Sequence, residues 1–325
     1  MLATAARRLG TRLFIMAVLV LPVALTWRVA TQAPPAEGAR APQQNLQYDL
    51  SGGWVPIVHE DANNRAAGGE YEILAGLPVN EAGRMRWEAF SENQVGLLEF
   101  QCRRYTSPYS LRSAHAILWI TTEFAPDSQR IIAFNLNYQP GGILLGGTRT
   151  IYLDSRPHPS PVSPHIFGGF STGTWDGNML NVDITHLKSY YTQRPGLPAS
   201  DERTVTEHWV RHGDLLTMTM AIHDPVFLTE PLVWSVTWAR NDGPMPPSDE
   251  PYCHASPEDT SATERRVPFF LPGTNPSIKD VMENYGVPED AVRGSGGAGM
   301  MYPEYRKQIK QTASSLDVCK RRCNN

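Results

Sequence analysis

The segment from residue 204 to residue 211 places a carboxylate where an apolar side chain is expected. Its residues alternate in character, so one face of a predicted strand carries Val205, Glu207, Trp209 and Arg211. A carboxylate on an apolar face loses its hydration, and an unpaired buried carboxylate has the raised pKa that suits a general acid or base. The alternative is a structural ion pair between Glu207 and Arg211 or another arginine.

A second group of ionisable residues follows the Gly-x-Trp at 52–54, which we expect to lie on the first strand. His59 and Asp61 lie two residues apart, so on an extended chain their side chains point the same way and can converge. An imidazole oriented by a carboxylate is a common form of general base. The candidate catalytic residues are therefore Glu207, its neighbour His208, His59 and Asp61. A solvated, charged loop around residue 59 is the alternative.

Two histidines, His158 and His165, lie in a segment punctuated by prolines. Proline restricts the backbone, so these imidazoles are held at low entropic cost, either as metal ligands or at the mouth of a cavity. His186, at the end of a predicted strand, can reach the mouth of a barrel. The chain has no HxH or HExxH spacing, so we expect neither a metal ion nor an organic cofactor.

The candidate ligand-binding residues combine cations, which can hold an anion, with rings, which can stack on a ligand. They are Arg65, Arg149, His158, His165, Trp175 and Arg211. The chain contains eight tryptophans and twelve tyrosines, enough aromatic surface to line a cavity. It has no Gly-x-Ser-x-Gly elbow. The glycine-rich stretch 168–173 precedes no helix, so we interpret it as strand glycines at a bulge or a close approach.

The elements that must position these residues are mainly β-strands. Apolar side chains recur at every second position, which predicts strands over residues 116–122, 131–138, 149–153, 178–184, 204–211, 216–222 and 232–238. Asp176-Gly177 and His212-Gly213-Asp214 have the composition of hairpin turns. Short turns between strands, without long helices, favour an antiparallel barrel or closed sandwich of lipocalin-like architecture.

Helices are expected to be few and short. Residues 80–93 form one with Asn80 as its N-cap, residues 277–285 form another, and residues 303–323 form a tail helix. The expected organisation has four parts. They are a signal peptide or membrane anchor (1–33), a flexible linker (34–47), a β-barrel or sandwich domain (48–242), and a loop with a helical C-terminal extension packing on the barrel (243–325).

The first 33 residues are typical of an export signal. Arginines precede an apolar run over residues 13–25, and small residues follow it up to Ala33. The run is short for a membrane-spanning helix. Pro34 would follow a cut after Ala33 and disfavours it, so membrane attachment through residues 13–27 is the alternative to cleavage. We expect a periplasmic or otherwise extracytoplasmic protein, free or anchored to the inner membrane.

Charge and cysteine content agree with this location. The formal net charge is −4 and no basic stripe is present, so nucleic acid is not an expected partner. An even number of cysteines in an oxidising compartment favours two disulfides, of open connectivity, over a metal site. The cysteines are Cys102, Cys253, Cys319 and Cys323.

Short motifs are distributed over most of the chain after residue 48. They are Asp-Leu-Ser-Gly-Gly-Trp at 49–54, His-Glu-Asp at 59–61, Gly-Leu-Pro-Val-Asn at 76–80, Arg-Pro-His-Pro at 156–159, Trp-Asp-Gly at 175–177, Thr-Glu-His at 206–208, Leu-Thr-Glu-Pro at 228–231, Leu-Pro-Gly-Thr-Asn-Pro at 271–276 and Met-Tyr-Pro-Glu-Tyr at 301–305. Together they resemble a family of exported bacterial proteins often labelled hypothetical. The resemblance implies export and a β domain, and no activity. His223 departs from the acidic residue expected before Asp224. The Gly-x-Trp at 52–54 resembles the start of lipocalin-type barrels, where the tryptophan closes one end.

Three functions fit these patterns. The first is a protein that binds a small hydrophobic or aromatic molecule in its barrel. The second is a cofactor-free acid–base enzyme, a lyase, isomerase or hydrolase, with Glu207 at its centre. The third is a structural or interaction protein of the cell envelope, which docks through its basic tail. The oligomeric state stays open.

Overall fold

The computed structural model describes most of the chain after residue 47. The described residues are 48–57, 74, 76–91, 94, 97, 103, 105–112, 117–128, 130–139, 147–193, 196–243, 269–285, 287–295, 299–300 and 302–307. All of them belong to one of two compact units, residues 45–325. The export segment, the linker, His59, Asp61, Arg65 and the four cysteines lie outside the described residues, so the predictions about them stay predictions.

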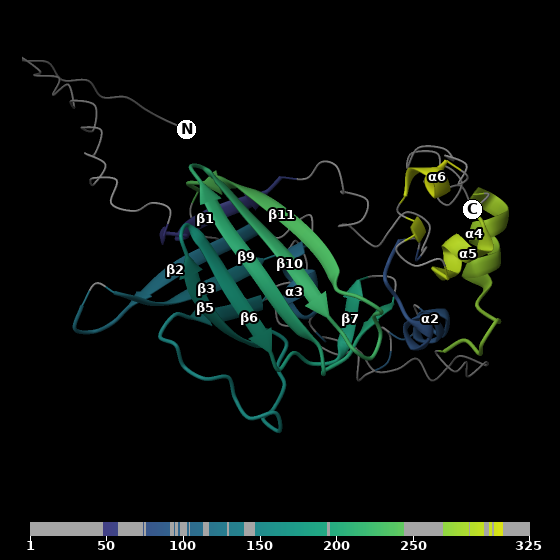
Figure 1. Cartoon of the computed structure of the whole chain (residues 1–325), viewed down its shortest axis with the longest axis horizontal. Coiled ribbons are helices and arrows are strands. Elements are labelled where there is room, and N and C mark those ends of the chain that lie inside the picture. Colours follow the sequence, from purple (N-terminus) through teal and green to yellow (C-terminus); the bar gives the residue numbers. More distant parts are fainter. Residues whose placement is uncertain are drawn as a thin grey trace, which may run out of the picture. The chain divides into compact units, whose positions relative to one another are not determined.

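Nine strands form a closed barrel, which confirms the predicted mainly β fold (Figure 1). Around the barrel the order is β1-β11-β10-β9-β6-β5-β4-β3-β2. The strands are β1 (Gly52–Pro56), β2 (Ile117–Phe124), β3 (Ile131–Gln139), β4 (Gly147–Tyr152), β5 (Phe170–Asp176), β6 (Met179–Thr185), β9 (Thr204–His212), β10 (Leu215–His223) and β11 (Leu232–Asn241). A closed ring leaves no unpaired strand edge.

Alternation in the sequence becomes alternation between the inside and the outside of the barrel. In β10 the inward side chains of Leu216, Met218, Met220 and Ile222 are fully buried, while the residues between them are partly exposed. The tight turns after β5 and β9 use Gly177 and Gly213, whose φ angles are +58° and +61°. Glycine adopts this left-handed conformation without steric penalty, as the predicted hairpin turns require.

One pairing differs from the expected antiparallel pattern, because β4 and β5 run parallel. A ring with an odd number of strands cannot alternate direction throughout, so at least one neighbouring pair must be parallel. The two strands meet only at Ile151 opposite Ser171 and at Tyr152 opposite Thr172. Residues 153–169 therefore have to return from the end of β4 to the start of β5, and we call them the crossover segment. It is the teal loop beside β5 and β6 in Figure 1.

Large side chains fill the middle of the barrel. Trp54, Phe134, Trp209 and Trp238 are all fully buried, and the rings of Trp209 and Trp238 stack with centroids 5.7 Å apart. A barrel of this size has an interior about wide enough for side chains to fill. Trp54, Trp209 and Trp238, which are among the aromatic residues expected to line a cavity, pack in the core.

The helix α2 (Glu81–Glu88) begins where the sequence predicts. The side chain of Asn80 accepts a hydrogen bond from the amide of Gly83 at 2.9 Å, which confirms Asn80 as the N-cap. The Nδ2 of Asn80 also donates to the carbonyl of Val226 at 2.9 Å, in the loop between β10 and β11. The cap therefore fixes this helix to one end of the barrel.

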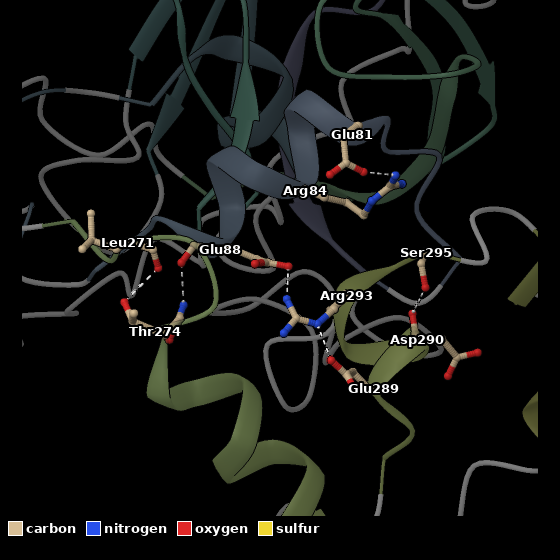
Figure 2. A network of polar contacts seen from close by, with 10 residues as sticks. Glu81, Arg84, Glu88, Leu271, Thr274, Glu289, Asp290, Arg293 and Ser295 are labelled. Atoms are coloured by element: carbon tan, nitrogen blue, oxygen red, sulfur yellow. Dashed lines mark hydrogen bonds and ion pairs between the residues drawn. The ribbon is translucent and has the colours of Figure 1, made fainter.

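Three short helices follow the barrel, α4 (Pro276–Tyr285), α5 (Glu289–Arg293) and α6 (Pro303–Arg306). Polar contacts join α2 to α5 and to Asn275, the residue before α4. Arg293 forms ion pairs with Glu88 of α2 and with Glu289, as Figure 2 shows. Hydrogen bonding to Glu88 is the main cause that raises the pKa of Arg293. Asn275 donates to the carbonyl of Glu88 at 3.0 Å. Of the long predicted tail helix, only α6 falls within the described residues.

The sequence analysis did not predict the helices α3 (Ser107–Arg112) and α5, or a two-stranded sheet of β7 (Tyr190–Gln193) and β8 (Leu197–Ala199). α3 is buried along its length and packs against β4, β7 and β11, so its polar residues gave no amphipathic pattern to recognise. Within the described part of the chain, no helix combines the length and apolar character needed to cross a bilayer.

Candidate functional site

Glu207 forms a buried ion pair with Arg149 inside the barrel. Arg149 on β4 donates through Nη1 to Oε1 at 2.8 Å and through Nη2 to Oε2 at 2.7 Å, and both side chains are fully buried. Trp209 adds a third hydrogen bond, from Nε1 to Oε2 at 2.9 Å. Burial alone would lower the pKa of Arg149, but the charge and hydrogen bonds of Glu207 outweigh it and raise this pKa.

Glu207 thus forms an ion pair, which is the alternative to an unpaired carboxylate, and its partner is Arg149 instead of Arg211. Because neither side chain has any accessible surface, no space large enough for a water molecule borders the pair. Both carboxylate oxygens are already engaged. The pair links β4 to β9 across the interior.

Arg211 and Trp175 both contact residues that precede β1, since the ring of Trp175 lies 5.1 Å from that of Tyr48. Arg211 donates to the carbonyl of Asp49 at 2.5 Å and its guanidinium lies 5.3 Å from the ring of Trp54. Arg240 lies 5.5 Å from the same ring. Burial first, and then the like charge of Arg240, lower the pKa of Arg211. The buried ring of Trp54 thus lies near two cations.

His158 joins the crossover segment to the outer face of the barrel. Its Nε2 lies 2.7 Å from Oγ1 of Thr172 on β5, and its Nδ1 lies 2.7 Å from Oγ1 of Thr185 on β6. Oγ1 of Thr185 is also 2.7 Å from Nδ1 of His186, whose Nε2 lies 2.9 Å from the carbonyl oxygen of Ser160. These five groups form one continuous hydrogen-bonded chain.

The carbonyl of Ser160 sets the direction of this chain, because it can only accept. His186 must therefore donate from Nε2, and in its neutral form its Nδ1 accepts from the hydroxyl of Thr185. The oxygen of Thr185 then accepts from Nδ1 of His158, which leaves the Nε2 lone pair of His158 to accept from the hydroxyl of Thr172. The tautomer of neutral His186 is therefore set by the carbonyl of Ser160, and that of neutral His158 is set by Thr185.

The backbone and the local charges support a neutral His158. His186 adopts φ +57°, a left-handed conformation that costs a non-glycine residue about 1 kcal/mol or more, and this places its ring next to Thr185. Burial is the main cause that lowers the pKa of His158, His186 lowers it further, and Asp183 opposes the change. A neutral imidazole is the form that can accept a proton.

Aromatic side chains surround His158 on the same outer face. The ring of Phe170 lies 5.2 Å from the imidazole and 5.4 Å from the ring of Tyr152. The guanidinium of Arg156 lies 3.7 Å above Tyr152 and is held there by hydrogen bonds to Asp154. The hydrogen bond from Arg156 is the main cause that lowers the pKa of Asp154 to about 2. We call Tyr152, Arg156, His158 and Phe170 the outer-face site; all four side chains are partly or fully exposed.

The remaining candidate residues lie apart from this site or are already engaged. Nδ1 of His165 lies 3.1 Å from the carbonyl oxygen of Leu187, and the ring of His165 lies 5.1 Å from that of His186. These contacts anchor the crossover segment. His208 is exposed on the outer face, 2.6 Å from Oδ1 of Asn181, whereas Glu207 points inward. Among the described residues, no three His, Cys, Asp or Glu side chains converge as a metal site.

Sequence reasoning missed Thr172, Thr185, Phe170 and Tyr152. Only the register shows that they share a face: Phe170 lies opposite Thr185 on β6, and Tyr152 lies opposite Thr172 across the parallel pair. Gly173 of β5 was a partial sequence signal for close packing at this strand. A Cβ on this residue would come within 2.8 Å of Leu153 and within 3.0 Å of Leu180. The predicted close approach at this stretch is therefore confirmed.

Comparison with known proteins assigns neither a family nor a function to this site. No protein-family model matches the chain, and neither a curated protein nor a solved structure shows significant similarity to it. The function must therefore be argued from the geometry of the chain itself.

Proposed function

We propose that this protein is exported and that its barrel binds a small aromatic or hydrophobic molecule at the outer-face site. The observation that carries the proposal is the group of partly exposed rings of Tyr152, Phe170 and His158 beside a cation. Binding sites for small molecules usually combine apolar rings with a few well-held polar groups. The packed interior supports an outer site over one in the middle of the barrel.

The outer-face site is held in place before any ligand arrives. Asp154 fixes the guanidinium of Arg156, and the hydrogen-bonded chain through Thr172 and Thr185 fixes His158. Groups that are already ordered lose little conformational entropy on binding. An aromatic ring of the ligand would cover apolar surface of Phe170 and stabilise the complex by roughly 25 cal/mol for each Å² of apolar surface buried.

Native mass spectrometry of the protein purified from its exported compartment tests the binding proposal. We expect an adduct with the mass of a small organic molecule in the wild type, and its loss in Phe170→Leu, which keeps an apolar side chain but removes the ring. Phe124→Leu is the matched control, because Phe124 is an exposed aromatic residue at the end of β2. An adduct that survives Phe170→Leu and disappears in Phe124→Leu would contradict the outer-face site.

The export part of the proposal rests on the arginines and the apolar run of residues 1–33. Cell fractionation of the full chain and of a variant without residues 2–33 tests it. We expect the full chain outside the cytoplasm and the shortened chain inside. Both chains in the cytoplasm would contradict export, and the mass of the exported chain shows whether the segment is cut.

A further inference from the structure

The hydroxyl of Thr172 and the imidazole of His158 have the relation of a nucleophile and its general base. Oγ1 of Thr172 lies 2.7 Å from Nε2 of His158, and the direction of the hydrogen-bonded chain requires the hydroxyl to donate to that nitrogen. Thr185 orients the opposite edge of the ring, and His186 in turn orients Thr185. An activated hydroxyl needs such a base and an orienting group behind the base.

From this geometry we propose that the protein hydrolyses a carboxylic ester of a small aromatic or hydrophobic molecule, with Thr172 as nucleophile and His158 as general base. The inference rests on the proposed outer-face binding site, because Phe170 and Tyr152 would hold the apolar part of the ester. Thr172 is partly exposed on the same face as these rings, so a carbonyl carbon can approach its oxygen. Glu207, the candidate from sequence, has no such access.

The reaction balances with water as the only co-reactant. Oγ1 of Thr172 attacks the ester carbonyl carbon while its proton passes to Nε2 of His158. The bond between that carbon and the leaving oxygen breaks, and Nε2 returns the proton to the departing alcohol. Water then attacks the acyl-Thr172 carbonyl, gives a proton to Nε2, and the carboxylic acid leaves as Oγ1 recovers that proton.

A p-nitrophenyl ester such as p-nitrophenyl butyrate is the probe, applied to the full chain. We expect release of p-nitrophenol and a butyryl group on Thr172, located by mass spectrometry of peptides after acid quenching. Thr172→Val removes the hydroxyl at nearly constant volume and should abolish both, whereas Thr172→Ser should retain labelling. Thr174→Val is the matched control, because Thr174 is exposed on the same strand and the same face.

His158→Gln separates catalysis from simple chemical reactivity of a hydroxyl. General-base catalysis contributes about 100-fold or more, so labelling of Thr172 should slow by at least that factor at a saturating concentration of the ester. The wild-type rate should also fall at low pH, as His158 becomes protonated, and this fall should be absent from the residual rate of the variant. The fall reports general-base catalysis where it occurs at pH values at which the protein stays folded.

Two outcomes would overturn the inference while leaving the binding proposal standing. The first is an organic adduct in the wild type together with equal ester labelling of the wild type and Thr172→Val. The second is butyryl transfer to another residue. Whether the adduct is lost or retained in Phe170→Leu tests the binding site alone. Failure of the binding proposal is therefore recognised by a different measurement.

Discussion

Glu207 and Arg149 stabilise the barrel only as a complete pair. Two charges removed from water are each costly, and here the bidentate contact and the hydrogen bond from Trp209 compensate that cost. The sequence shows a carboxylate on an apolar face, but it does not show which cation faces it. Arg149 lies 58 positions earlier in the chain, so the pairing depends on barrel closure and not on local pattern.

Removing one charge of this pair should be more harmful than removing both. We expect Glu207→Gln to lower the free energy of unfolding by about 3–5 kcal/mol, because the guanidinium of Arg149 then stays buried without a counter-charge. The double variant Glu207→Leu with Arg149→Met should recover most of this loss. Chemical denaturation followed by tryptophan fluorescence measures both, and a single variant within about 1 kcal/mol of wild type would show that the pair is not needed.

His158 predicts a dependence of stability on pH. Its folded-state pKa lies below the ordinary value of 6.5, so between the two values the unfolded chain binds more protons than the folded one. Stability should therefore fall as the pH decreases from 6.5 through the folded pKa, and it should be unaffected by this group above 6.5.

Titration of the imidazole by NMR and denaturation at several pH values check this expectation. The stability of the variant His158→Gln should therefore fall less than that of the wild type as the pH decreases through this range. A His158 that titrates above 6.5 would contradict the expected direction.

At the scale of elements, the strands and the two hairpin turns could be predicted from the sequence, but the order of the strands around the ring could not. The alternation in residues 204–211 and 216–222 corresponds to β9 and β10 almost to the residue, because one face of each strand is buried. The parallel contact of β4 with β5 depends on the number of strands in the ring, which no single strand encodes. In the outer-face site, His158 was a candidate from the sequence, but Tyr152 and Phe170 could not be predicted because they lie on the two sides of that contact.

The N-cap of α2 offers a test at this scale. We expect Asn80→Ala to lower the free energy of unfolding by about 1 kcal/mol or more, because it removes the bond to Gly83 as well as the one to Val226. Asn80→Asp retains an oxygen for the cap but loses the donor to Val226, so it should fall between the wild type and Asn80→Ala. Thermal unfolding of the three proteins measures the order, and equal midpoints for Asn80→Ala and wild type would refute the role of the cap.

At the scale of the whole molecule, the barrel is held together without free strand edges. Every barrel strand has a partner on each side, and the interior is filled by buried aromatic side chains and the central ion pair. In the part of the chain that the structure describes, the small sheet consists of the two short strands β7 and β8, whereas nine strands form the barrel. Local opening should therefore differ between these two parts of the chain.

Hydrogen exchange measures that difference. We expect the amides of β9 and β10 to exchange only through global unfolding, with protection close to the full free energy of unfolding, and those of β7 and β8 to exchange by local opening at lower free energy. Peptide-level exchange followed by mass spectrometry resolves both regions. Equal protection in β7 and β10 would show that the small sheet opens only together with the barrel.

The pairing of β1 with β11 has a consequence for the order in which the newly made chain can fold. Gly53 lies opposite Asn241, so the first and last strands of the barrel are neighbours although most of the chain separates them. Hairpins such as β5–β6 and β9–β10 can form as soon as they emerge from a ribosome or a translocation channel. The ring cannot close until residue 241 has also emerged, and until then both β1 and β11 expose unpaired edges that a chaperone can protect.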